Sequence, residues 1–121
     1  MADSTPITRE QLEAYANAHR KALREEQKGN PLDEALQKAR QPLKVFLGAT
    51  PDLRGTDLKQ MNLQLLDISG SLCQDADFRG ATLTGAKLSH ANLQNAKLRR
   101  AVLQNADLSH TDLTGIDAQD A

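Results

Sequence analysis

Apolar residues follow one spacing rule before residue 50 of this 121-residue chain and another rule after it. In the first part, one stripe recurs at intervals of three and four residues: Leu12, Tyr15, His19 and Ala22. That spacing is one face of an amphipathic helix. We therefore expect the first part of the chain to be helical.

Local signals indicate where the first helix begins and ends. Thr8 and Gln11 have the spacing of a capping box, and Ile7 with Leu12 has that of the accompanying hydrophobic staple. Gly29 is the residue type that most often follows the end of a helix. The first helix is therefore predicted to begin after Thr8 and to stop near Lys28.

Two prolines divide the rest of the helical part. Asn30 followed by Pro31 fits a cap and a first helical position, so a second helix is predicted from Pro31 to about Arg40. Pro42 would break a continuing helix. It is predicted to open a short third helix, 42–47, which Gly48 ends.

After residue 50 the apolar period is five. Every fifth residue is nonpolar, and these side chains are predicted to form the core: Leu53, Leu58, Leu63, Ile68, Cys73, Phe78, Leu83, Leu88, Leu93, Leu98, Leu103, Leu108 and Leu113. Ala stands two residues before the central residue in seven successive repeats, from Ala76 to Ala106. A period of five fits neither a helix nor a flat strand. Self-similarity at a fixed period is typical of a solenoid.

A second period of twenty residues is superimposed on the first. The segment 88–93 recurs, with two changes, at 108–113. Twenty residues are four repeats of five, so a four-sided coil would place residue n on residue n+20. Residues of one kind then form columns, such as Lys59, Arg79 and Arg99.

These repeats closely resemble the A(D/N)Lxx pattern of the pentapeptide-repeat family. The match is clear at Ala76-Asp-Phe-Arg-Gly80, Ala91-Asn-Leu-Gln-Asn95 and Ala106-Asp-Leu-Ser-His110. The resemblance implies a mainly β protein, a right-handed quadrilateral β-helix whose central residue and preceding small residue face inward. Five of the seven Gly share one phase of the repeat. We expect that phase to be a corner, where Gly turns the chain without steric cost.

The predicted organisation is a helical segment, 1–50, followed by a β-helix of about three coils, 51–121. Solenoid ends need caps, and the helical segment is either an N-terminal cap or a docking arm. Bulky Met61 and Leu66 replace Ala early in the repeats, so the tube is wider there or leans on the helices. The C-terminal coil has no comparable cap. Either Asp117 and Asp120 blunt that end, or it is a surface for end-to-end homodimer formation, which is our hypothesis.

Composition and charge exclude several classes of function. The net charge is -1 and only 2% of the residues are aromatic, which argues against direct nucleic-acid binding. No apolar run is long enough to span a membrane, and no signal peptide is visible at the N-terminus. The expected compartment is the cytoplasm, without a membrane partner.

The chemistry-bearing side chains do not predict an enzyme. His90 and His110 would stack beside Ser89, Ser109 and Asp107, but identical outward columns are what repeat duplication produces. Stacked coils also offer no concave pocket. Cys73 is expected to be a small buried hydrophobe rather than a reactive thiol. We predict no catalytic residue, no metal site and no cofactor.

The charged column leaves two interpretations open. Asp57 and Asp77 precede bases on the same face, so the column is either a solvated salt-bridge ladder or a contact patch for an acidic partner. The candidate partner-binding residues are Lys59, Arg79, Lys97, Arg99 and Arg100.

We expect a non-enzymatic protein-protein interaction module or scaffold with an unidentified protein partner. The resemblance implies an alternative, a DNA-mimicking binder of a type II topoisomerase, as in the quinolone-resistance members that modulate gyrase. That role needs a strongly acidic face. Residues 51–121 carry nine Asp against seven Lys and Arg, so the alternative ranks second.

Overall fold

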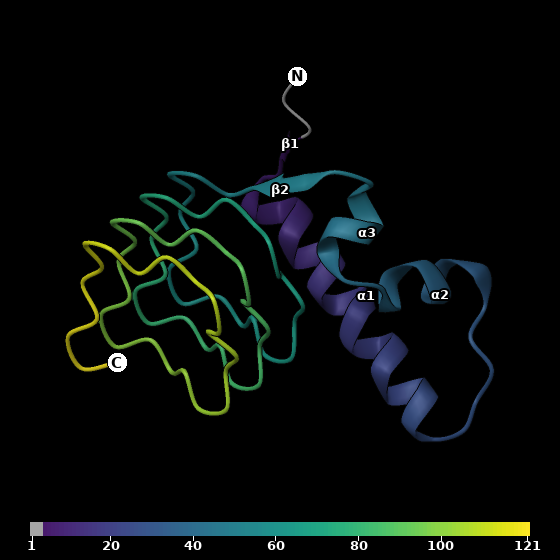
Figure 1. Cartoon of the computed structure of the whole chain (residues 1–121). Coiled ribbons are helices and arrows are strands. Elements are labelled where there is room, and N and C mark those ends of the chain that lie inside the picture. The colour runs from purple at the N-terminus through teal and green to yellow at the C-terminus, as the bar shows by residue number, and fades with distance from the viewer. Residues whose placement is uncertain (1–3) are drawn as a thin grey trace.

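The computed structural model describes residues 4–121 and contains a helical end and a stack of coils (Figure 1). The elements in chain order are β1 (Ser4–Pro6), α1 (Arg9–Gln27), α2 (Glu34–Arg40), α3 (Leu43–Leu47) and β2 (Thr50–Asp52). Strands β1 and β2 pair in parallel, with Ser4 opposite Thr50. No sequence signal predicted β1, because three residues are too few to show a period.

Helix α1 begins as the sequence predicted. The Thr8 side chain accepts the Gln11 backbone N–H at 3.1 Å, and the Gln11 side chain accepts the Thr8 N–H at 2.9 Å. Gly29, just beyond the last turn, has a positive φ of 81°. The predicted stripe of four residues from Leu12 to Ala22 is buried.

Helix α2 begins three residues later than predicted, because Asp33 rather than Asn30 caps it. The Asp33 carboxylate accepts the Leu36 backbone N–H at 2.8 Å, and an anion is favourable at a helix N-terminus. Asn30 is already used at the end of α1, where its side chain donates to Glu25 at 2.6 Å. Helix α3 agrees with prediction, since Gly48 ends it with φ of 69°.

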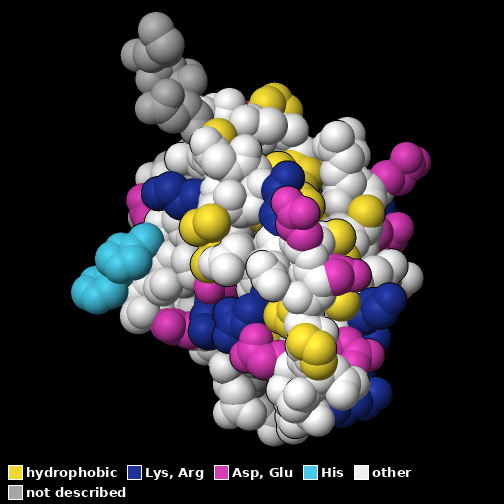
Figure 2. Space-filling view, turned by 90° about the vertical axis from the view of Figure 1, so that its right-hand side faces the viewer, with side chains coloured by type: hydrophobic (Ala, Val, Ile, Leu, Met, Phe, Trp, Pro, Cys, Tyr) yellow, Lys and Arg dark blue, Asp and Glu magenta, His cyan; other side chains and the backbone are white. Residues whose placement is uncertain are grey.

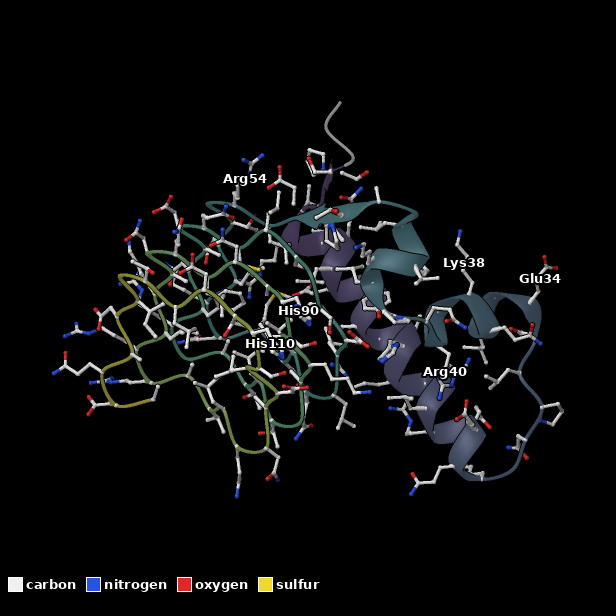
Figure 3. The ribbon with its side chains drawn as sticks, in the orientation of Figure 1. Glu34, Lys38, Arg40, Arg54, His90 and His110 are labelled. Atoms are coloured by element: carbon white, nitrogen blue, oxygen red, sulfur yellow. The ribbon has the colours of Figure 1, made fainter. Side chains whose placement is uncertain are left out.

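A small polar cluster joins α2 to α1. His19 lies with its Nδ1 atom 2.8 Å from the Ala39 carbonyl, and the Tyr15 hydroxyl donates to the Gln41 carbonyl at 2.7 Å. On the outer side, the Arg40 guanidinium reaches back to Glu26 (Figure 3). These contacts hold α2 beside the part of α1 that projects beyond the coils (Figure 1).

From residue 52 onward the chain is a ladder of parallel bridges. Each bridge joins residue n to residue n+20, from Asp52 with Leu72 to Lys97 with Asp117. The predicted period of twenty is therefore confirmed. The inward Ala residues from Ala76 to Ala101 are buried, which lets neighbouring sides approach closely.

The corner phase is occupied by more than glycine. All five repeat glycines there have positive φ, as expected, but so do nine residues of other types: Gln60, Leu65, Asp75, His90, Asn95, Arg100, Asn105, His110 and Asp120. The geometry of the coil therefore requires the left-handed backbone conformation at each corner, whichever residue type stands there. Non-glycine residues adopt it at an energetic cost that the surrounding ladder must offset.

Most of the predicted core is buried, but its last three members are not. The central residues from Leu53 to Leu98 are buried, whereas Leu103 and Leu108 are partly buried and Leu113 is 37% exposed. These three lie in the last coil, and no described residue stacks beyond them. Whether a second copy covers this end stays a prediction.

The helical segment donates hydrogen bonds to backbone carbonyls of the first coil. In later coils, carbonyls at the equivalent positions accept backbone N–H groups from the coil before. For example, the Thr82 carbonyl accepts the Leu63 N–H at 2.8 Å. In the first coil, N-terminal residues donate instead. The pairs are Ile7 N–H with Asp52, Arg9 with Asp57, Arg20 with Asn62 and Gln64, and Leu43 N–H with Asp67.

Apolar contacts accompany these bonds. Met61 and Leu66 are buried in one cluster with Leu12 and Tyr15 of α1 and with Leu43 of α3. Met61 also lines a hollow with Ala16 and Arg20 of α1, which supports contact with the helices as the explanation for a bulky residue there.

Candidate interaction site

One face of the coils carries an open groove of about 820 Å³. Ten residues line it: Arg9, Asp57, Lys59, Gln60, Arg79, Gly80, Arg99, Arg100, Gln119 and Asp120. We call this the basic groove. It brings together four of the five candidate partner-binding residues predicted from sequence.

The ladder positions the cations of the basic groove. Asp57, Asp77, Lys97 and Asp117 form one continuous column of bridges. Because the groove cations stand at fixed offsets from this column, Lys59, Arg79 and Arg99 are stacked one coil apart. Neighbouring strands lie about 4.8 Å apart, so the cations repeat at about that spacing.

Arg9 enters the groove from the start of α1 and was not predicted. Its guanidinium donates to the Asp57 carbonyl at 3.1 Å and lies 3.8 Å from the Asp57 carboxylate. No repeat-based pattern can find it, because it stands 48 residues from its neighbour in sequence. The capping box at Thr8 places the helix start but not its contact with the coil.

Lys97 was predicted to belong with these cations, and the structure places it beside the groove rather than among the residues that line it. It occupies the column of bridging residues, between Asp77 and Asp117, and does not line the groove. Asp57 of the same column lines the groove, and Asp77 bonds the groove residue Arg79, so this column runs along the edge of the groove. Lys97 is exposed outside the groove.

The salt-bridge ladder predicted for the charged column is present in part. Arg79 binds Asp77 through two hydrogen bonds of 2.9 and 2.7 Å, and this bonding holds the pKa of Asp77 below its usual range. Arg99 lies 3.4 Å from Asp117. Within residues 4–121, by contrast, no carboxylate lies within 4.0 Å of the charged atoms of Lys59 or Arg100.

The Asp-x-Arg spacing explains which cations are paired. Arg54 binds Asp52 in the same two-bond manner, at 2.9 and 2.8 Å, on another side of the coil (Figure 3). Lys59 has the same spacing from Asp57, but its single ammonium cannot make a planar two-bond contact. Only the Lys59 backbone N–H reaches Asp57, at 3.1 Å.

Outward Asp and Asn residues serve the backbone of their own repeat. In nine repeats the Asp or Asn just before the central residue accepts, through its side chain, the backbone N–H of the residue just after the central one. These acceptors are Asp52, Asp57, Asn62, Asp67, Asp77, Asn92, Asp107, Asp112 and Asp117. This Asx-type turn explains the D/N of the motif. The acids are thus spread around the coil, which does not favour the DNA-mimicking alternative.

His90 and His110 form the predicted stack, with ring centroids 4.8 Å apart and planes 8° from parallel. The pair projects from the surface (Figure 2). Ser109 donates to Asp107 at 2.6 Å instead of to a histidine, so these residues do not form a nucleophile-base pair. Among the described residues, no three His, Cys, Asp or Glu side chains are grouped to hold a metal ion.

Cys73 lies fully buried inside the coil, as predicted. Burial, with a smaller contribution from Asp52, raises the pKa of its thiol from 9.0 to about 12. The folded protein should therefore react with a thiol reagent only as fast as it opens, since the thiolate is the reactive form.

The same pKa shift sets a pH dependence of stability. The unfolded thiol ionises first as the pH rises, so the contribution of Cys73 is complete below about pH 9 and declines toward pH 12. Denaturant unfolding below and above about pH 9 will check the pH dependence. Thiol-reagent kinetics in buffer and in guanidinium will check the protection of Cys73, with the exposed variant Gln104→Cys as a fast-reacting control. Rapid native labelling of Cys73 would contradict it.

The helical end shows Lys and Arg side chains intermixed with Asp and Glu (Figure 2). No described helix is both long enough and apolar enough to cross a membrane.

Comparison with known proteins gives a family and several related structures. The family model for pentapeptide repeats matches residues 52–85 and 76–115, with eight copies. No curated protein matches the chain. A pentapeptide repeat protein (Rfr23) from the cyanobacterium Cyanothece 51142 is 34% identical, with a TM-score of 0.47, over 55% of this chain and 52% of that chain.

Two matches come from Nostoc PCC 7120. HetL, a pentapeptide repeat protein involved in heterocyst differentiation regulation, is 28% identical, with a TM-score of 0.32, over 60% of this chain and 38% of that one. The protein alr5209 is 36% identical, with a TM-score of 0.24, over 61% of this chain and 69% of that one. The present chain thus spans about half or less of the first two structures it matches.

Proposed function

Since the chain belongs to the pentapeptide-repeat family, we propose that it is a non-enzymatic interaction module that binds a protein partner through the side of its coils. The observation that supports this most directly is the basic groove. Four of its five cations stand on the ladder, where backbone pairing at every coil keeps the side chains in fixed columns, and Arg9 joins them from α1. A preorganised surface loses little conformational entropy on binding.

The helical segment, in this proposal, is a cap for the first coil. Its residues donate to five first-coil carbonyls and cover the apolar side chains at that end. Such a cap prevents another strand from pairing with the open edge. The side of the coils is then left as the surface for a partner, in the cytoplasm as expected from the sequence.

Affinity capture from the native host tests the proposed function. The full chain is compared with Lys59→Glu/Arg99→Glu/Arg100→Glu in the groove. A matched triple variant, Lys21→Glu/Arg24→Glu/Lys28→Glu, places the same charge change on and just after α1. We expect one protein to be retained by the wild type and the α1 variant but lost from the groove variant. Equal retention by all three, or no retained protein, would contradict the proposal.

A further inference from the structure

The basic groove holds positive charge that its own residues do not neutralise. Five cations line it against two carboxylates, Asp57 and Asp120, and Asp77 and Asp117 pair with Arg79 and Arg99 from its edge, which leaves a charge of +1 from five minus four. Arg9 is shared between Asp57 and Glu13, each at 3.8 Å. Lys59 and Arg100 have no such carboxylate neighbour among residues 4–121. A concave surface with this balance attracts an anionic group.

The lining also limits which anion can bind. It contains no aromatic ring on which a base could stack, so single-stranded nucleic acid lacks its usual platform. Asp57 and Asp120 would repel the phosphates of a long nucleic acid, and the net charge of -1 gives no general attraction for one. A polypeptide with acidic and neutral positions can avoid both carboxylates.

The spacing of the cations suits a short peptide segment. Gln60, Gly80 and Arg100 occupy one corner column, so Lys59 and Arg100 stand about two coil spacings, or roughly 10 Å, apart. An extended chain advances about 3.4 Å per residue, so two acidic residues three positions apart cover that distance. Gly80 between them adds no side chain, and the Gln60 side chain covers it, with Cγ 3.2 Å from where a Cβ would stand.

We propose that the basic groove binds a short acidic segment of the partner protein. Its carboxylates pair with Lys59 and Arg100, and Arg9 supplies a third contact. This inference rests on the proposed function and goes beyond it by assigning the chemistry of the partner and two cations that recognise it. Arg79 and Arg99, already paired with Asp77 and Asp117, frame the groove.

Fluorescence anisotropy with the full-length chain tests this inference. The probe is a labelled peptide with Glu at positions three apart, compared with the same peptide carrying Gln and with an oligothymidylate of equal charge. The variant Lys59→Gln/Arg100→Gln removes both unpaired cations. Its control, Lys21→Gln/Lys28→Gln, makes the same charge change at exposed positions of α1 and its C-terminal cap. Circular dichroism checks that each variant is folded.

The expected result is binding of the Glu peptide alone. Its affinity should fall about tenfold in the groove variant, the effect of losing two exposed ion pairs, and should stay nearly unchanged in the control. Equal weakening in both variants, no binding by the wild type, or tighter binding of the oligothymidylate would overturn the inference. If affinity capture still retains a partner while the peptide does not bind, the proposed function stands and the acidic-segment inference fails.

Discussion

Deletion of residues 1–48 is expected to leave coils that aggregate or unfold. The deletion removes the donors to the first-coil carbonyls, including Ile7, Arg9 and Arg20. It also exposes Met61 and Leu66, which are buried against the helices. An open edge with apolar side chains behind it pairs readily with other chains. Light scattering and circular dichroism of the truncated and full-length chains will measure the effect.

A point variant provides a graded version of the same experiment. Arg20→Gln removes two hydrogen bonds, at 3.1 and 3.2 Å, to the carbonyls of Asn62 and Gln64. The loss of free energy of unfolding should be about 1–3 kcal/mol, as for hydrogen bonds to a charged group. The exposed neighbour Lys21→Gln is the matched control. A truncated chain that stays monomeric and folded would show that the helices are an arm rather than a cap.

The second large effect concerns two leucines at the same repeat position. Leu83→Ala should lower the free energy of unfolding by about 2–5 kcal/mol, because Leu83 is fully buried and its loss leaves a cavity. Leu113→Ala should cost less than about 1 kcal/mol, because that side chain is 37% exposed in the last coil. Urea unfolding of both variants and the wild type will measure the difference.

The comparison of these two variants tests whether the last coil is uncovered in solution. Both replace the central Leu of a repeat, so their sequence contexts are equivalent and only burial differs. Equal losses would mean that something covers Leu113 in solution, such as a second copy of the chain at the C-terminal end.

Much of the fold could be predicted because the central residue of each repeat fills the interior of the coil, so an apolar side chain recurs there every five residues. The five-residue period and the agreement between residues twenty apart gave the column register that the bridges confirm. The start of α2 could not be predicted as easily, because Asn30 and Asp33 are both good caps. In the structure Asp33 caps α2, and the Asn30 side chain bonds Glu25 instead.

The candidate site was predictable only where it follows the repeat. Arg79 and Arg99 fall in the predicted column, whereas Arg9 reaches the groove through a tertiary contact that no spacing encodes. Lys97 stands in the column at the edge of the groove, and the repeat spacing alone does not distinguish the edge from the lining. Left-handed corners at nine non-glycine residues also escaped prediction, since the coil imposes them against local preference.

The twenty-residue register also determines which length changes the molecule can accommodate. A single inserted residue would shift every later side chain out of phase, whereas five inserted residues would preserve the core. That insertion would nevertheless rotate everything after it by one side of the square. Placed between Arg79 and Arg99, it would carry Arg99 and Arg100 onto the neighbouring side and divide the basic groove while leaving the fold intact. Only insertions or deletions of whole twenty-residue turns keep both the core and the alignment of the outward columns. Length variation is therefore a separate way to create or remove a binding face.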